Sequence, residues 1–206
     1  MSSRIAVLAS GEGTNLEALL DDPLVGPQIA LVLSDRRDSR ALERAQARGV
    51  AAVFLDPAAS PSRDEYDREI LDLLEAEGIE IVCLAGFMRI LSPPLVRAFW
   101  GRMLNIHPAL LPAFPGASAV RDALAWGARL TGVTVHFVDE EVDHGPIVLQ
   151  EAVPILDGDD ENSLHARIQE VEHRLYPNAL RLLLEGRVSI EGRQVRILDP
   201  QPSEAR

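Results

Sequence analysis

Asn105 and His107 are the two side chains of this sequence with the clearest potential for chemistry. They stand in the segment Asn105-Ile106-His107-Pro108. Residues two apart in a strand share a face, and a proline keeps the residue before it extended. An amide donor and an imidazole at the carboxyl end of a strand can therefore point at one reacting atom, to stabilise negative charge or to move a proton. A histidine at a strand end is more often structural, so the pair is a candidate only.

Asp143 is the carboxylate that could serve this pair. It lies in the acidic segment Asp139–Pro146, whose other carboxylates are typical of a solvated loop. Asp143 differs because Gly145-Pro146 follow it and favour a tight turn before the next strand. A carboxylate fixed beside His107 would orient the ring and favour its protonated form. The sequence does not show that the two side chains meet.

The turn Ser10–Asn15 is a candidate anion site between a predicted strand and a predicted helix. Backbone N–H groups at a helix start, together with the helix dipole, bind phosphate well. We expect Thr14 or Asn15 to cap this helix. Asp35, after the next strand, suits a ribose contact, but Leu16 occupies the third glycine position of a dinucleotide fingerprint. The alternative that this is a glycine-rich turn that binds no ligand therefore remains open.

These residues need a sheet to bring them together, and the chain has the pattern of one. Short apolar runs alternate with helical patterns, which predicts βαβ units and a mainly parallel, twisted sheet with helices on both faces. We expect a single α/β domain over residues 1–206, a small hairpin near 188–198 and a frayed tail at 200–206. The strands are expected at Ile5–Ala9, Ile29–Leu33, Ala51–Leu55, Ile79–Ala85, Met103–His107, Leu130–Phe137 and Ile147–Val153.

Charge and cysteine content limit the partners. The 206 residues carry 20 basic and 32 acidic side chains, a net charge of −12, which argues against nucleic acid. All 20 basic residues are arginine, which excludes lysine Schiff bases and the lysine of a P-loop. The single cysteine, Cys83, lies in an apolar run and is expected to be an inert core thiol. We expect no signal peptide and no membrane contact, and hence a cytoplasmic protein.

Four segments together resemble the phosphoribosylglycinamide formyltransferase family, which transfers a formyl group from 10-formyltetrahydrofolate in purine synthesis. The Asn-x-His-Pro segment and the later Asp-x-Gly-Pro loop mark formyl transfer in general. The Ser-Gly-x-Gly-Thr-Asn turn points to the glycinamide ribonucleotide branch. The resemblance covers nearly the whole chain and implies the Rossmann-like formyltransferase fold. The segments are Ser10–Asn15, Leu84–Leu91, Asn105–Pro112 and Gly132–Pro146.

The resemblance also implies which residues form the site. Members of the family commonly have a histidine where this chain has Ser118, so that contact is expected to differ. The implied catalytic residues are Asn105, His107 and Asp143. The ribonucleotide side is implied at Gly13, Thr14, Asn15, Gln169, Glu170, Val171 and Glu172. The formylfolate side is implied at Arg63, Met88, Arg89, Ile90, Leu91, Asn105, Asp139, Glu140, Glu141, Val142 and Asp143.

The implied reaction is attack of the amine of phosphoribosylglycinamide on the formyl carbon of 10-formyltetrahydrofolate, the cosubstrate. Asn105 and protonated His107 would stabilise the resulting oxyanion, and Asp143 would help to move a proton. Residues 1–100 would mainly provide the phosphate-substrate half, and 101–206 the catalytic and folate half. We expect small-molecule partners only, with a monomer or a homodimer.

We expect no metal, because the remaining histidines are typical of structural or solvated positions and form no ligand cluster. They are His136, His144, His165 and His173.

Three other functions account for part of this sequence pattern. A methionyl-tRNA formyltransferase shares the chemistry but has a further C-terminal domain and must hold RNA, which 206 residues at −12 do not suit. A formyltransferase acting on an amino sugar nucleotide is harder to exclude by chemistry, and the Gly11–Asn15 turn and the short C-terminus argue against it. A noncatalytic dinucleotide-binding module would leave Asn105, His107 and Asp143 unexplained.

Overall fold

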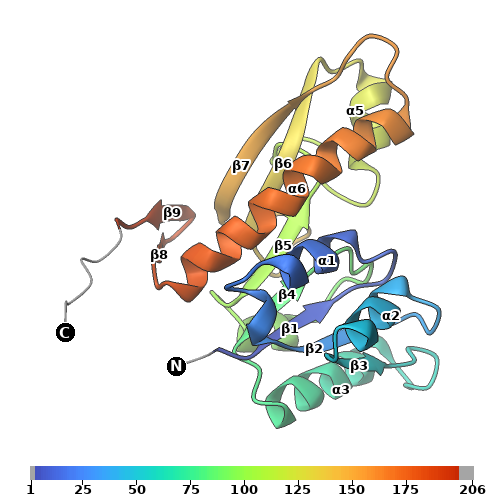
Figure 1. Cartoon of the computed structure of the whole chain (residues 1–206), viewed down its shortest axis with the longest axis vertical. Coiled ribbons are helices and arrows are strands. Elements are labelled where there is room, and N and C mark those ends of the chain that lie inside the picture. The colour runs from blue at the N-terminus through green and yellow to red at the C-terminus, as the bar shows by residue number, and fades with distance from the viewer. Residues whose placement is uncertain (1–2, 200–206) are drawn as a thin grey trace.

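A sheet of seven strands in the order β3-β2-β1-β4-β5-β6-β7 organises the computed structural model, which describes residues 3–199 (Figure 1). The pairings among β1 to β5 are parallel, and β6 and β7 are antiparallel to their neighbours. The prediction of a mainly parallel sheet is confirmed, whereas the predicted tail at 200–206 lies outside the described residues. The strands are β1 (Ile5–Leu8), β2 (Ile29–Ser34), β3 (Ala51–Phe54), β4 (Ile81–Leu84), β5 (Met103–His107), β6 (Leu130–Phe137) and β7 (Ile147–Pro154).

Helices cover both faces of this sheet. The α-helices of the described residues are α1 (Thr14–Asp21), α2 (Arg40–Ala47), α3 (Arg63–Ala76), α4 (Pro93–Ala98), α5 (Ala119–Trp126) and α6 (Glu161–Leu184). Buried residues of α1, α2, α5 and α6 belong to one core cluster, and those of α3 and α4 belong to the other. The short helix η1 (Gly26–Gln28) leads into β2.

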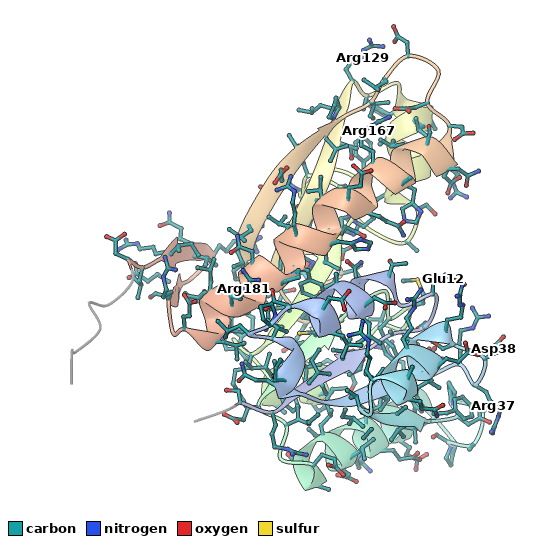
Figure 2. The ribbon with its side chains drawn as sticks, in the orientation of Figure 1. Glu12, Arg37, Asp38, Arg129, Arg167 and Arg181 are labelled. Carbon is teal, nitrogen blue, oxygen red and sulfur yellow. The ribbon has the colours of Figure 1, made fainter. Side chains whose placement is uncertain are left out.

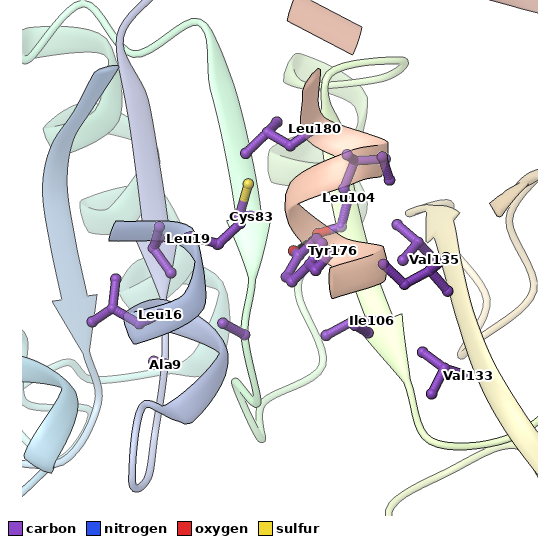
Figure 3. Close-up of a cluster of buried hydrophobic side chains, with 14 of the residues drawn as sticks. Ala9, Leu16, Leu19, Cys83, Leu104, Ile106, Val133, Val135, Tyr176 and Leu180 are labelled. Carbon is purple, nitrogen blue, oxygen red and sulfur yellow. Dashed lines mark hydrogen bonds between the residues drawn. The ribbon is translucent and has the colours of Figure 1, made fainter. Parts of the chain in front are cut away.

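The central strands are apolar throughout because each face has its own core. In β1, Ile5 and Val7 pack in the cluster below α1 and α6, whereas Ala6 and Leu8 pack in the cluster of α3 and α4. This continuous apolar pattern is typical of a parallel strand with both faces covered. Figure 3 shows side chains of α1 and α6 meeting over the strands of the first cluster.

One buried hydroxyl attaches α6 to the sheet. Tyr176, fully buried, donates to the carbonyl of Leu84 at 3.0 Å and of Leu104 at 3.1 Å. Cys83 lies beside it as a buried free thiol, as predicted, and burial raises the pKa of that thiol to about 12 (Figure 3). A thiol with so high a pKa is not a nucleophile at neutral pH, because the thiolate is the reactive form.

The predicted hairpin follows α6. It consists of β8 (Val188–Glu191) and β9 (Gln194–Ile197), which pair antiparallel around the two-residue turn Gly192-Arg193. Figure 1 shows the hairpin beside the first residues of β7, where Val188, Ile190 and Val195 pack on the core.

Many of the arginines on the outer surface are neutralised by a neighbouring carboxylate. Arg129 pairs with Asp157 at 2.6 Å and Arg167 with Asp159 at 2.8 Å, both near the start of α6 (Figure 2). Arg181 pairs with Asp22 across α6 and the end of α1. The Arg129–Asp157 pair is exposed on both sides and contributes little to stability, whereas the carboxylates of Asp22 and Asp159 are largely covered. All three pairs leave little free positive charge. Within residues 3–199, no helix is both long and apolar enough to span a bilayer.

We expect Tyr176→Phe to lower the free energy of unfolding by about 1–2 kcal/mol, because two buried carbonyl contacts lose their donor. Urea unfolding monitored by circular dichroism measures this loss. Tyr66→Phe is the matched control, since its hydroxyl makes a single, longer bond of 3.3 Å to the carbonyl of Leu55. Equal losses in the two variants would contradict the role given to Tyr176.

Candidate functional site

A cavity of about 690 Å³ opens at the carboxyl ends of the parallel strands. Its walls come from the turn after β1, the segment after β4, the end of β5 and the loop between β6 and β7, with parts of α5 and α6. Open α/β sheets bind ligands at this edge, and the volume suits an organic molecule of cofactor size.

Strands β5 and β6 present polar side chains on one of their two faces. Asn105 pairs with His136 and His107 pairs with Thr134 across the two antiparallel strands. These four side chains share one face because alternate residues of a strand point the same way. The intervening residues are core, namely Leu104, Ile106, Val133, Val135 and Phe137.

The Asp143 carboxylate connects the predicted catalytic residues. Its Oδ1 accepts from Nδ2 of Asn105 at 3.3 Å, and its Oδ2 lies 3.3 Å from Nδ1 of His107. Oδ2 also accepts from the backbone N–H of Gly116 at 2.7 Å. The structure thus brings Asn105, His107 and Asp143 together without an intervening group, as the sequence analysis expected.

Backbone strain is concentrated around His107. The non-glycine residues with positive φ in the described chain are Phe114, at 51°, and Asp143, at 52°. The carbonyl of Phe114 lies 2.8 Å from Nε2 of His107, so each strained residue contacts one ring nitrogen. Gly145 is needed beside them, because a Cβ there would lie 1.8 Å from the carbonyl oxygen of Phe137. Strain of this kind persists where the surrounding structure enforces it, as at functional sites.

Charge and burial act on His107 in opposite directions. Burial lowers the pKa of His107 below its ordinary value, and the Asp143 carboxylate and the Phe114 carbonyl oppose this shift without cancelling it. The carboxylate therefore acts in the expected direction but does not prevail. Burial also raises the pKa of Asp143, but His136, the Gly116 N–H and His107 outweigh it and hold that pKa below the ordinary value.

His136 lines the cavity and contacts the predicted catalytic residues, which the expectation of a structural or solvated position did not foresee. Its Nδ1 lies 2.8 Å from the carbonyl of Phe137 and must donate there, which leaves Nε2 to accept from Nδ2 of Asn105 at 3.2 Å. The same Nε2 lies 3.6 Å from Asp143. His136 thereby fixes the orientation of the Asn105 amide. The alternation Val-Thr-Val-His in β6 was the signal, since it predicts a strand with one polar face.

Glycine, rather than a side-chain cap, shapes the turn before α1. Gly13 is the N-cap, with φ 71°, and a Cβ there would lie 2.9 Å from Cα of Ala41. The prediction that Thr14 or Asn15 caps this helix was wrong, because both lie inside it. Their side chains are therefore available to the cavity, which all three residues line.

α6 faces the same side of the cavity with two of its predicted residues. Gln169 donates to Oγ1 of Thr14 at 3.5 Å, and Glu172 accepts from Nδ2 of Asn15 at 3.0 Å. The Oδ1 of Asn15 is buried and has no hydrogen-bond partner within residues 3–199. Glu172 is itself buried, and burial raises its pKa although Asn15 and His165 oppose the shift.

The other two predicted residues of α6, Glu170 and Val171, do not line the cavity, so their contact with the ribonucleotide stays a prediction. Glu170 is exposed, and Val171 packs against the core. A helix turns about 100° per residue, so only residues three or four apart reach one side.

The opposite wall is apolar and open. Met88 is 68% exposed and Ile90 56% exposed, far above what core residues show, and both line the cavity with Leu91. Val142 is half-exposed in the facing loop Asp139–Asp143, every residue of which lines the cavity as predicted. Exposed apolar side chains gathered in a cleft favour an aromatic or apolar ligand.

The two arginines predicted for the folate side lie differently. Arg63 does not line the cavity, and its Nη2 donates to the carbonyl of Leu91 at 3.2 Å. Arg89 lines the cavity, but its guanidinium stacks on the ring of Tyr66, 4.9 Å from the centroid. Neither arginine forms an ion pair with a carboxylate within residues 3–199.

Further residues reach the cavity beyond those predicted. Ser118, at the N-cap of α5, lines the cavity and accepts from Nη2 of Arg121 at 2.6 Å. His165, predicted as a structural or solvated residue, is exposed and also lines the cavity. Asp35, the suggested ribose contact of a dinucleotide, is not among the lining residues. Residues 3–199 hold no group of three or more His, Cys, Asp and Glu side chains suited to a metal ion.

Comparison with known proteins gives consistent matches. Residues 3–180 match the family model described as formyl transferase. Glycinamide ribonucleotide transformylase 1 from Symbiobacterium toebii has a similar structure, with a TM-score of 0.93 and 54% identity over 96% of this chain and 94% of that chain. Phosphoribosylglycinamide formyltransferase from Mycobacterium tuberculosis (strain H37Rv) is 47% identical over 193 residues, 93% of this chain and 89% of that protein.

Longer relatives contain a similar segment. The trifunctional purine biosynthetic protein adenosine-3 of Gallus gallus is 46% identical over 190 residues, 91% of this chain but 19% of that protein. The chain therefore spans about a fifth of this trifunctional relative.

We expect Asp143→Asn to lower the pKa of His107 further, because the carboxylate that opposes the effect of burial is lost. Activity that needs the protonated ring would then be lost at a lower pH as the pH rises. NMR titration of the His107 ring measures the pKa in both proteins. Asp157→Asn is the control, because the exposed Asp157 pairs with Arg129 away from the cavity. An unchanged or higher pKa in Asp143→Asn would contradict the coupling.

We expect Glu172→Gln to raise the melting temperature at pH 7. A carboxyl group whose pKa is raised on folding stabilises the fold only while it is protonated, and this contribution is lost as pH rises through the folded pKa. The gain in melting temperature from this substitution should therefore shrink as the pH falls toward about 4, near the ordinary pKa of a glutamate. Scanning calorimetry between these pH values, with the exposed Glu170→Gln as control, measures it. A gain that grows on acidification would disprove the assignment.

Proposed function

The chain belongs to the formyl transferase family, and we propose that it transfers the formyl group of 10-formyltetrahydrofolate to the amine of phosphoribosylglycinamide. The products would be formylglycinamide ribonucleotide and tetrahydrofolate, a step of purine synthesis. One arrangement supports this reaction above all others: Asn105, His107 and Asp143 meet in a cavity with an anion-binding turn on one side and an apolar wall on the other.

The substrate amine would attack the formyl carbon beside Asn105 and His107. A carbon–nitrogen bond forms, and the carbonyl electron pair moves onto the formyl oxygen. The Asn105 amide and the protonated His107 imidazole would be the N–H donors for that oxyanion, each giving up a contact that it makes in the ligand-free site. The intermediate then collapses, and the bond to the folate nitrogen breaks with its electron pair.

Asp143 is suited to the proton transfer that this step requires. The attacking amine must lose a proton, and the departing folate nitrogen must gain one. The lowered pKa of Asp143 keeps it ionised at neutral pH, where its charge favours a protonated His107, and its contact with His107 would let it assist a proton transfer through that ring or a water. Two N–H donors and one carboxylate suffice for this chemistry, so we infer that no metal is required.

The ribonucleotide would lie against α1 and α6. Its phosphate fits the N-terminus of α1 at Gly13–Asn15, where backbone N–H groups and the helix dipole attract an anion. Glu172 and the unpartnered Oδ1 of Asn15 are acceptors for hydroxyl or amine groups of the same molecule. Gln169, whose amide donates to Thr14, is a further hydrogen-bonding group on this side of the cavity.

The folate donor would lie on the opposite wall. Members of this family use a formylated folate as cosubstrate, and Met88–Leu91 with the loop Asp139–Asp143 give its ring system apolar contacts and backbone hydrogen-bonding groups. Arg63, beside the carbonyl of Leu91 and without a carboxylate partner in residues 3–199, is suited to the glutamate tail. In a chain of net charge −12, attraction of two anionic ligands must come from such local groups.

Turnover of phosphoribosylglycinamide with 10-formyltetrahydrofolate, followed as release of tetrahydrofolate, tests the proposal. We expect Asn105→Ala to lower kcat by about 10² to 10³, the usual effect of removing one oxyanion donor. Asn178→Ala, an exposed position on the far part of α6, is the matched control and should retain activity. Wild-type turnover in Asn105→Ala would rule out this mechanism.

The same assay distinguishes phosphoribosylglycinamide from the alternative acceptor, an amino sugar nucleotide. An amino sugar nucleotide offered in place of phosphoribosylglycinamide should give no tetrahydrofolate. Turnover with the amino sugar nucleotide alone would replace the proposed acceptor but keep formyl transfer.

A further inference from the structure

The turn of the C-terminal hairpin contacts His144, which directly follows the cavity-lining loop Asp139–Asp143. Arg193 and Gly192, which has φ 59°, form the turn between β8 and β9. The base of the hairpin is closed where Leu198 N–H donates to the carbonyl of Arg187 at 2.8 Å and the Arg187 side chain donates back at 2.9 Å. With its apolar face packed on the core, the hairpin holds Arg193 at a defined place.

Within residues 3–199, the hydrogen bonds of the Arg193 side chain all go to one residue, His144. Its Nη2 donates to the backbone carbonyl of His144 at 2.6 Å, and its Nη1 lies 3.1 Å from Nε2 and 3.3 Å from Nδ1 of the ring. Nδ1 lies 2.7 Å from Asp139 Oδ2 and donates there, so the guanidinium of Arg193 contacts a ring that Asp139 already orients. One guanidinium thereby fixes both the backbone and the ring of His144.

His144 occupies a position where backbone placement matters. It follows Asp143, which has positive φ, and precedes Gly145, where a Cβ would collide with the backbone at Phe137. A second guanidinium also binds this loop. Arg97 of α4 donates to Glu140 with bonds of 2.6 and 3.1 Å. Arg97 holds the first part of the loop, and Arg193 holds the part next to Asp143.

We propose that Arg193 is a positioning residue, which fixes the peptide after Asp143 and so keeps the Asp143 carboxylate against His107 and Asn105. The hairpin lies outside residues 3–180, the part that matches the family model. The effect on turnover rests on the proposed function, whereas the effect on the placement of Asp143 does not.

Kinetics of Arg193→Ala provide the first test. We expect kcat for formyl transfer to fall about five- to tenfold, the effect of losing one charge-assisted hydrogen bond at an exposed site. KM for phosphoribosylglycinamide should change less than about twofold, because its side of the cavity is formed by α1 and α6. Arg193→Lys should recover part of kcat, since one ammonium donor can still reach the carbonyl. Arg196→Ala is the control, because Arg196 pairs with Glu191 within the hairpin.

The pKa of His107, titrated by NMR in the ligand-free protein, provides a readout without turnover. A displaced Asp143 opposes burial less, so the pKa of His107 should be lower in Arg193→Ala than in the wild type and unchanged in Arg196→Ala. An unchanged pKa in Arg193→Ala overturns the proposal, whatever kcat does. If the wild type fails to formylate the amine while this pKa shift occurs, the proposed function is wrong and the positioning role stands.

Discussion

The partly buried carboxylate of Asp143 is the group on which the rest of the site depends. It lies 3.3 Å from the donors of both Asn105 and His107, and a backbone N–H of the loop after β5 holds it from a third side. A buried charge is unfavourable unless hydrogen bonds surround it, and here the loops that surround it also form the cavity. The requirement to solvate one carboxylate therefore explains why two loops, remote in sequence, close over the same face of the sheet.

The residues around the cavity include several that lower the stability of the fold but that the site requires. Phe114 and Asp143 have backbone conformations that few side chains adopt, and Glu172 is a buried acid whose pKa is raised. Each of these features costs free energy, and the apolar sheet and the Tyr176 contacts offset them elsewhere. The cores under α1, α6 and α3 are regular, whereas the irregular features gather around the cavity.

Much of the fold and part of the site could be predicted from sequence, for reasons that differ between residues. Strand alternation alone puts Asn105 and His107 on one face, and apolar runs between helical patterns predict the parallel sheet. His136 was missed because its place depends on which strand pairs with β5 and in which register. Glu170 and Val171, which were predicted together with their neighbours as one helical segment, do not line the cavity because successive residues of a helix face different directions. Arg193 has no local signal, since its partner His144 is distant in sequence.

The antiparallel register of β5 and β6 links folding to chemistry. Asn105 lies opposite His136, and His107 lies opposite Thr134, so the same backbone ladder that aligns the core also aligns the polar face. A slip of one residue would bury these side chains under α6 and turn valines toward the cavity. Such a chain would lose its core and its site together. A molecule with the wrong register is therefore unstable as well as inactive. The stability of the fold alone favours correct assembly of the site.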